Sequence, residues 1–185
     1  MRLFDGSVRE SRNGGFVHVL REQESKTWVN TIRPKVSQSA TQILASLEQR
    51  HVVYNTLLEN LTLSGRHSDD LLRRGLYDTF IAHNLFASVP GEGKAKIVCA
   101  DLATRFDLSG VPGFFRQGNN WRLAVGDWSA GYFVPVRDLA ERIQALQIRR
   151  DSGDSRYVWL SSKEKPEGTT SGAPVHFAAS HRLEQ

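Results

Sequence analysis

The chain has 185 residues, of which 39% are hydrophobic and 24% charged, and its formal net charge is +4. These values are typical of one globular domain with a small appendage, and the charge is compatible with a polyanionic partner without indicating one by itself. The single cysteine excludes an internal disulfide and a multi-cysteine zinc site. No apolar run is long enough to span a bilayer, and the N-terminal residues lack the apolar segment of a secretory signal. We therefore expect a cytoplasmic protein without a membrane partner.

Residues 1–36 predict a short β-hairpin appendage. An alternating segment over residues 16–21 follows the turn signal Asn13-Gly14-Gly15, and residues 26–34 supply a second short strand that ends at Pro34.

The middle of the chain predicts helices. Apolar residues at helical spacing over residues 37–64 indicate one long helix, or two with a bend near residues 49–51. Ser68 is then expected to cap a short helix that Gly75 terminates, and Asp78 to cap the next one. Residues 91–110 predict a further helix, in which Cys99 is a small core residue.

The remaining elements predict a mainly antiparallel sheet. The turn signal Gly118-Asn119-Asn120 separates two short strands. Two apolar runs, Phe133–Val136 and Ile143–Ile148, then form a hairpin, and residues 155–162 add a strand. The fold class is therefore α+β: an N-terminal β-hairpin, a helical middle and a C-terminal mainly antiparallel sheet. We expect an α+β domain over residues 37–165 and a flexible tail over residues 166–185.

Arginines occur along and after this hairpin. Strict alternation places Arg137 on the same face as Phe133, and Arg149 and Arg156 are expected to join it on one sheet surface. Such a surface suits single-stranded nucleic acid, because guanidinium groups bind phosphate oxygens and aromatic rings stack on bases. The alternative, equally supported by the pattern, is a solvated face on which the arginines pair with nearby aspartates such as Asp138 and Asp151.

The helical region is not expected to contribute to this surface or to catalysis. We expect the replacement of His67 or Asp70, both in the helical region, to leave the salt dependence of single-strand binding unchanged. Asp69 and Asp70 are adjacent and point in different directions on a helix, so they are a poor metal pair. The histidines, at positions 51, 67, 83, 176 and 181 among others, show neither zinc-finger nor HExxH spacing.

Two stretches of the sequence resemble a known family. They are VVYNTLLENLTLSGRHSDDLLRRGLYDTFIAHNLFASVP and AGYFVPVRDLAERIQALQIRRDSGDSRYVWLSS, which together cover roughly residues 50–165. In motif, order and separation they are similar to the N-terminal subdomain of the RNA-polymerase core of bacterial DNA primases, and to primase-like proteins of plasmids and mobile elements. The resemblance implies a module that helps to hold single-stranded template DNA.

The resemblance also implies which residues contact nucleic acid. The family's "PIRD", "GR", "GFGGR" and "KY" motifs are matched here, in chain order, by Arg137, Asp138, Arg142, Arg149, Arg156 and Tyr157. Glu141, Gln147 and Ile148 stand where the family has glycines.

The catalytic metal site of the family belongs to a Toprim domain, which the resemblance does not cover. The resemblance therefore implies no cofactor in this chain and Mg²⁺ only together with a Toprim partner, so we expect no primer synthesis by this chain alone. The expected partners are single-stranded DNA and a Toprim-containing chain or a replicative helicase. The alternative is a replication-associated interaction module without catalytic activity, and whether the chain is a fragment of a DNA primase stays open.

Overall fold

The computed structural model describes residues 9–10, 16–17 and 43–177. The chain divides into two compact units, Met1–Ser37 and Gln38–Gln185. In the first unit, β1 (Arg9–Glu10) pairs antiparallel with β2 (Phe16–Val17). The expected strand from residue 16 thus begins where predicted but pairs with residues that precede it. The expected second strand over residues 26–34 lies outside the described residues.

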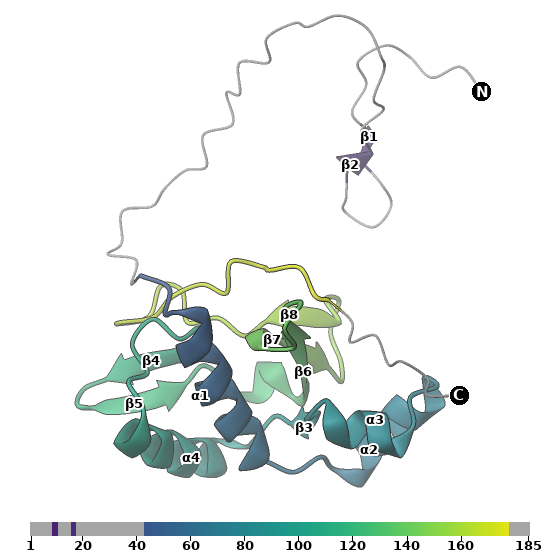
Figure 1. Cartoon of the computed structure of the whole chain (residues 1–185), viewed down its shortest axis with the longest axis horizontal. Helices are drawn as coiled ribbons and strands as arrows, with labels where there is room; N and C mark the ends of the chain where they lie inside the picture. Colours follow the sequence, from purple (N-terminus) through teal and green to yellow (C-terminus); the bar gives the residue numbers. More distant parts are fainter. Residues whose placement is uncertain (1–8, 11–15, 18–42, 178–185) are drawn as a thin grey trace, which may run out of the picture. The chain divides into compact units, whose positions relative to one another are not determined.

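The described part of the second unit, residues 43–177, contains four α-helices, drawn in Figure 1. They are α1 (Leu47–Glu59), α2 (Gly65–Arg73), α3 (Asp78–His83) and α4 (Glu92–Arg105). The long helix expected up to residue 64 ends earlier, at Glu59, and shows no break near residues 49–51. It begins at Leu47 because the Ser46 hydroxyl accepts the Gln49 N–H, which satisfies one of the free amides of the first turn.

The start of α2 also differs from the expectation. Its N-cap is Ser64 and not Ser68, whose own N–H already donates to the Ser64 carbonyl as part of the first helical turn. The expected end of α2 is confirmed, because Gly75 follows the helix with a φ of +89°. Asp78, expected to cap α3, is instead its first residue, and Tyr77 stands in the N-cap position.

A four-stranded antiparallel sheet in the order β3-β6-β7-β8 forms the C-terminal part of this unit. Its strands are β3 (Ala87–Ser88), β6 (Gly131–Arg137), β7 (Ile143–Arg150) and β8 (Tyr157–Trp159). A separate hairpin joins β4 (Phe114–Gln117) to β5 (Asn120–Leu123), and a short 3₁₀ helix spans Asp127–Ser129. The α+β class and the β6–β7 hairpin are confirmed, whereas β3 was not expected from the sequence.

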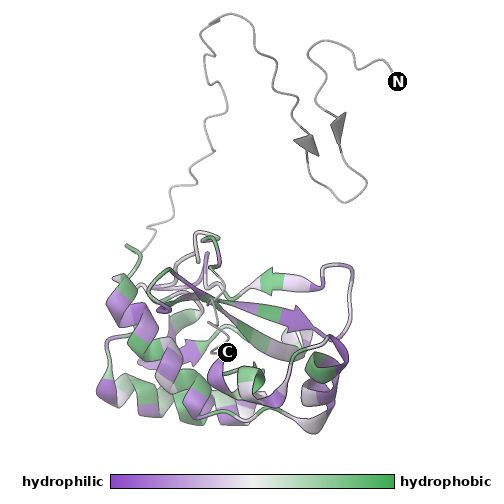
Figure 2. Ribbon diagram, turned by 45° about the vertical axis from the view of Figure 1, so that its right-hand side comes forward, coloured by the Kyte–Doolittle hydropathy of each residue, from purple (hydrophilic) through white to green (hydrophobic). Residues whose placement is uncertain are grey.

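Both faces of the β6–β7 hairpin are covered by helices. Phe133 and Ile148 are fully buried in the main core, to which α1 and α4 contribute. On the opposite face, Tyr132 packs with Leu71 of α2 and Ile81 of α3 in a smaller cluster. The hydropathy colours in Figure 2 alternate along the helices, as is usual for helices with one buried side. The hairpin therefore presents no broad solvated face, and α2 lies directly over one end of it.

The segment that follows β8 packs against the domain. Thr169 and Ser171 are buried, and the Thr169 N–H donates to the Ser162 hydroxyl at 3.0 Å. The Phe177 N–H donates to the Arg137 carbonyl at 3.0 Å. Several polar groups of residues 166–177, part of the expected flexible tail, thus bond to the rest of the domain, and residues 178–185 lie outside the described part. In the described ranges, no helix has the length and apolarity needed to cross a membrane.

Candidate nucleic-acid interface

The structure separates the six expected binding residues into two groups. Arg137, Asp138 and Arg142 lie at the turn between β6 and β7. Arg149, Arg156 and Tyr157 lie at the other end of the hairpin, where Gly131 pairs with Arg150. The single sheet surface expected to carry Arg137, Arg149 and Arg156 together is therefore not formed.

Arg137 is part of the folded core and not of a binding surface. Its exposed fraction is 9%, and burial lowers the pKa of its guanidinium. Its Nη1 donates to the Glu141 carbonyl at 2.7 Å, and its Nη2 lies 3.5 Å from the Asn84 carbonyl. The register also shifts between Val136 and Arg137, so the strict alternation assumed from the sequence breaks at this residue. The guanidinium of Arg137 thus binds main-chain oxygens of this chain.

Asp138 and Arg142 bind each other within the turn. Arg142 donates to the Asp138 carboxylate through Nη2 at 2.7 Å and Nε at 3.0 Å, and its main-chain N–H adds a third bond at 2.8 Å. Burial alone would raise the pKa of Asp138, but these hydrogen bonds hold that pKa below its usual value. At this end of the hairpin, an arginine thus pairs with a nearby aspartate, as the alternative to a nucleic-acid-binding surface expected.

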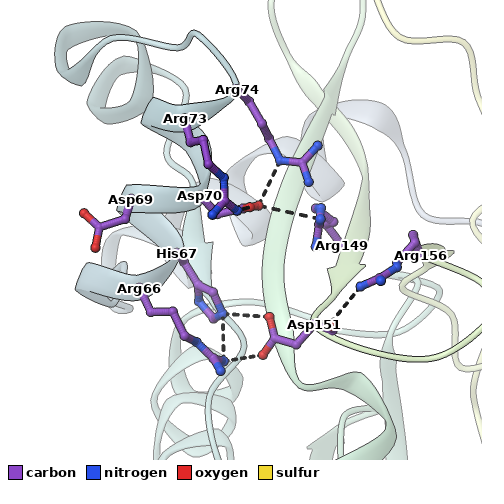
Figure 3. Close-up of a pocket in the computed structure, with 9 residues that line it drawn as sticks. All are labelled: Arg66, His67, Asp69, Asp70, Arg73, Arg74, Arg149, Asp151 and Arg156. Atoms are coloured by element: carbon purple, nitrogen blue, oxygen red, sulfur yellow. Dashed lines mark hydrogen bonds and ion pairs between the residues drawn. The ribbon is translucent and has the colours of Figure 1, made fainter.

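The other end of the hairpin forms one wall of a surface pocket of about 670 Å³. The opposite wall is α2, and Figure 3 shows the side chains of the two walls facing each other. The pocket is lined by Arg66, His67, Asp69, Asp70, Arg73, Arg74, Arg149, Asp151 and Arg156. Arg149 and Arg156 were expected at a binding surface. His67 and Asp70, whose replacement was expected to leave strand binding unaffected, line the same pocket.

Asp70 organises one half of the pocket. Its carboxylate accepts from Arg74 Nε at 2.9 Å, from Arg73 and from the Tyr132 hydroxyl at 3.2 Å. Arg149 Nη2 lies 3.7 Å from the same carboxylate. The hydrogen bond from Arg74, the largest influence, together with the other cations, lowers the pKa of Asp70 to about 2. Asp70 is therefore ionised throughout the physiological range and holds three arginines near one point.

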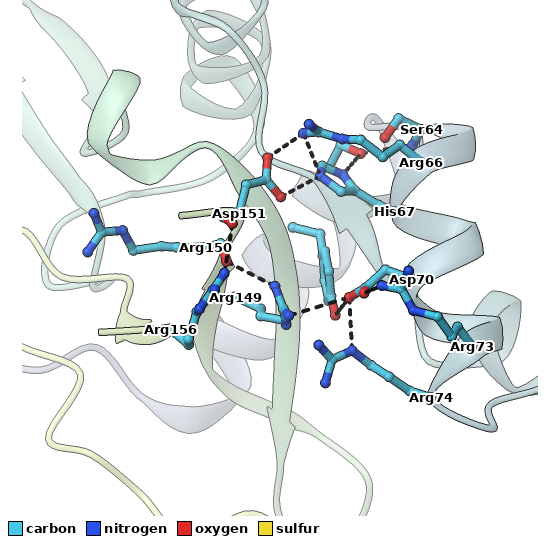
Figure 4. Close-up of polar contacts among 12 residues, drawn as sticks. Ser64, Arg66, His67, Asp70, Arg73, Arg74, Arg149, Arg150, Asp151 and Arg156 are labelled. Carbon is cyan, nitrogen blue, oxygen red and sulfur yellow. Dashed lines mark hydrogen bonds and ion pairs between the residues drawn. The ribbon is translucent and has the colours of Figure 1, made fainter. Parts of the chain in front are cut away.

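Asp151 organises the other half, as Figure 4 shows. Its carboxylate forms an ion pair with Arg66 and lies 3.0 Å from His67 Nε2, and its main-chain carbonyl accepts from Arg156 Nη1 at 2.8 Å. His67 Nδ1 in turn lies 2.7 Å from the Ser88 hydroxyl. The start of α2, the strand β3 and the end of β7 are thus joined through one buried imidazole.

The side-chain contacts from Ser88 to His67 and from His67 to Asp151 have the same order as the catalytic triad of a serine hydrolase. Two features assign them a structural part instead. Ser88 does not line the pocket, and its hydroxyl oxygen already accepts the Ser64 N–H at 2.8 Å. Asp151 is shared with Arg66, which projects from α2 toward the pocket. The three residues therefore fix the position of α2 over the sheet, and with it the position of Arg66.

The pocket carries an excess of positive charge on its outer side. Five arginines and three aspartates line it, so two positive charges remain even with a neutral His67. The side chains of Arg66 and Arg73 are 72% and 78% exposed, whereas that of Arg149 is only 12% exposed. Each guanidinium has five N–H donors, more than one aspartate can accept. The exposed arginines therefore keep donors available for an anion in the pocket.

Sequence reasoning missed the contribution of α2. Arg66, Asp70 and Arg73 are spaced at helical intervals of four and three residues, so they lie along one side of α2. This signal was present in the sequence, but the helix was expected to begin later, near Ser68, which left Arg66 outside it. The periodicity also does not show which other element faces that side of the helix.

A comparison with models of protein families found none that matches the chain, and a comparison with curated proteins found no match either. In the described part of the chain, no group of three or more His, Cys, Asp or Glu side chains is placed to hold a metal ion. What this site binds must be inferred from its geometry and charge.

Proposed function

We propose that the chain is a nucleic-acid-binding, primase-like module, which holds single-stranded template DNA for a Toprim-containing partner that supplies the Mg²⁺ site. One observation carries the proposal: five arginines from two segments far apart in the sequence converge on one pocket with excess positive charge. The resemblance to the primase core supports the same function, since Arg149 and Arg156 match its motifs.

The length of the pocket suits a polyanion better than a single small anion. Arg66 and Arg73 are seven residues apart on α2, which corresponds to about 10 Å at 1.5 Å per residue. A stacked strand carries one phosphate per roughly 3.4 Å of its helix axis, and successive phosphates lie farther apart than this rise. The exposed arginines therefore span more than one phosphate of a strand.

The arginines that face solvent provide the first test. We expect the triple variant Arg66→Ala, Arg73→Ala, Arg156→Ala to bind single-stranded DNA more weakly, and to weaken all sequences alike, because phosphates carry no sequence information. Log K falls with log salt at a slope of about −0.7 per neutralised phosphate on single strands. Loss of three contacts should therefore reduce the slope by about 2, measured by fluorescence anisotropy of a labelled oligonucleotide over a salt series.

Arg105→Ala and Arg142→Ala are matched controls. Their side chains are 49% and 41% exposed, and both lie outside the pocket. We expect wild-type affinity and slope from each. A folded triple variant that keeps the wild-type slope would refute the proposal. If the wild type binds no strand and instead captures a helicase or a Toprim chain, the alternative of a protein-interaction module is supported.

A further inference from the structure

Tyr157 lies beside Arg149 in the sheet, next to the residues that line the arginine pocket but not among them. It opens the edge strand β8 and is 51% exposed. Tyr157 is the register partner of Arg149, and directly opposed residues of an antiparallel pair project from the same face of a sheet. Its hydroxyl is also close enough to Arg74 to be among the groups that raise the pKa of Arg74, after the larger effect of Asp70. The ring of Tyr157 therefore adjoins the arginines.

The second tyrosine on this face is differently placed. Tyr132 is buried, its hydroxyl donates to Asp70, and the Arg149 guanidinium lies 5.8 Å from the centre of its ring. Tyr132 is thus a supporting residue beneath the pocket. Of the two rings, Tyr157 is the one that a ligand in the pocket can reach from solvent.

We infer that Tyr157 stacks on a base of the bound strand and makes the pocket select single strands over duplex DNA. This inference rests on the proposed function. A single strand exposes its bases, and any base can stack on an aromatic ring beside a cationic groove. In a duplex each base is already paired and stacked between its neighbours, so its ring faces are not available for stacking on a protein side chain. The arginines accordingly bind the phosphates of both forms of DNA, whereas Tyr157 stacks only on a base of the single strand.

The test compares a labelled single strand and a duplex of the same sequence at one salt concentration. We expect Tyr157→Ala to weaken single-strand binding by roughly fivefold or more and to leave duplex binding unchanged. Tyr157→Phe should keep wild-type selectivity, whereas Tyr157→Leu, which keeps bulk without an aromatic face, should behave like the alanine variant. The Phe and Leu variants also guard against a folding defect, since both side chains conserve the apolar contacts of the edge strand.

Tyr77 offers a matched control. It is 54% exposed, lies at the N-cap of α3 and packs edge-on against Phe80, outside the pocket. Tyr77→Ala should therefore leave the selectivity unchanged. A second readout uses an oligonucleotide with 2-aminopurine, whose fluorescence should be quenched on binding by the wild type and by Tyr157→Phe, but not by Tyr157→Leu.

The outcomes separate this inference from the proposed function. If the Ala and Leu variants keep the wild-type ratio of single-strand to duplex affinity, Tyr157 is not the selecting residue, although the arginine pocket still binds DNA. If the wild-type protein binds neither form, the proposed function itself fails. A loss of both forms in the Ala and Leu variants, with selectivity unchanged, would also overturn the role of Tyr157.

Discussion

At its turn, the β6–β7 hairpin carries Arg137 and Arg142, and both guanidinium groups bind acceptors of the hairpin and its neighbours. At its other end, Arg149 takes part in a pocket where five arginines, from α2 and from the strand side, outnumber three aspartates. Both ends carry residues of the stretches that resemble motifs of bacterial DNA primases. Only the second end presents exposed guanidinium groups on a concave surface.

The difference lies in burial and in the ratio of donors to acceptors. Arg137 is enclosed and Arg142 has a carboxylate of its own, so a phosphate at the turn would have to compete with bonds that are already made. At the pocket, Asp70 alone is shared by three arginines. An arginine in a binding motif is thus available to a ligand only where a neighbouring element supplies more cations than the fold itself neutralises.

The largest expected effect tests whether Arg137, at the turn end of the hairpin, stabilises the fold. Arg137→Ala should lower the free energy of unfolding by about 2–3 kcal/mol, because it removes a buried side chain and leaves the Glu141 and Asn84 carbonyls without their charged donor. Arg142→Ala, at the same turn but more exposed, should cost less than about 1 kcal/mol. Urea unfolding of both variants measures the difference. Equal stabilities would remove the distinction between the two arginines.

At the pocket end, we expect Asp70→Asn to change the free energy of unfolding by an intermediate amount. The pKa of Asp70 is about 2 in the folded protein against an ordinary value of 3.8, so its ionised form stabilises the fold. That contribution is fully present above about pH 5 and is lost as the pH falls through 4 toward 2. After allowance for solvent screening it is on the order of 1 kcal/mol. Near pH 7 the Asn variant should be less stable by this amount, and its unfolding free energy should depend less on pH between 5 and 2.

The same substitution should tighten the binding of single strands several-fold. Asp70 competes with phosphate for Arg73 and Arg74, and its replacement raises the charge of the pocket by one unit. A variant that is less stable yet binds more tightly is not explained by general damage to the fold. Asp138→Asn, which removes the corresponding carboxylate at the turn end, should leave the affinity unchanged. Weaker binding by Asp70→Asn would indicate that Asp70 positions the arginines more than it competes for them.

Local sequence patterns predicted the elements better than their assembly. The two apolar runs of the β6–β7 hairpin and the turn at Gly118 identified their strands correctly, because alternation and turn chemistry act over a few residues. Strand β3 was missed, since two residues are too few to show an alternation. The Ser46 hydroxyl caps α1, whereas Ser64 precedes α2 without a side-chain cap hydrogen bond, so the serines in the sequence did not by themselves show where each helix begins.

The candidate site was predicted only in part for a different reason. Arg66 and Asp151, which form an ion pair across the pocket, are separated by 85 positions in the sequence. Nothing in the local pattern of α2 shows that it packs over the end of β7. The arginines on the strand side were found through the family motifs, whereas those on the helix side depend on tertiary packing.

The smallest expected effect concerns Glu141, at the turn end, where the primase family has a glycine. Its φ is +62°, a conformation that costs a residue with a Cβ about 1–2 kcal/mol, part of which the greater chain entropy of unfolded glycine offsets. Glu141→Gly should therefore stabilise the protein by about 0.5–1 kcal/mol, while Ala140→Gly, at an ordinary φ, should destabilise it slightly. Arg137 bonds to the carbonyl of residue 141, so that contact persists, and DNA affinity should not change. If both glycine variants shift the urea midpoint in the same direction, backbone strain at Glu141 is not the reason for the family's glycine.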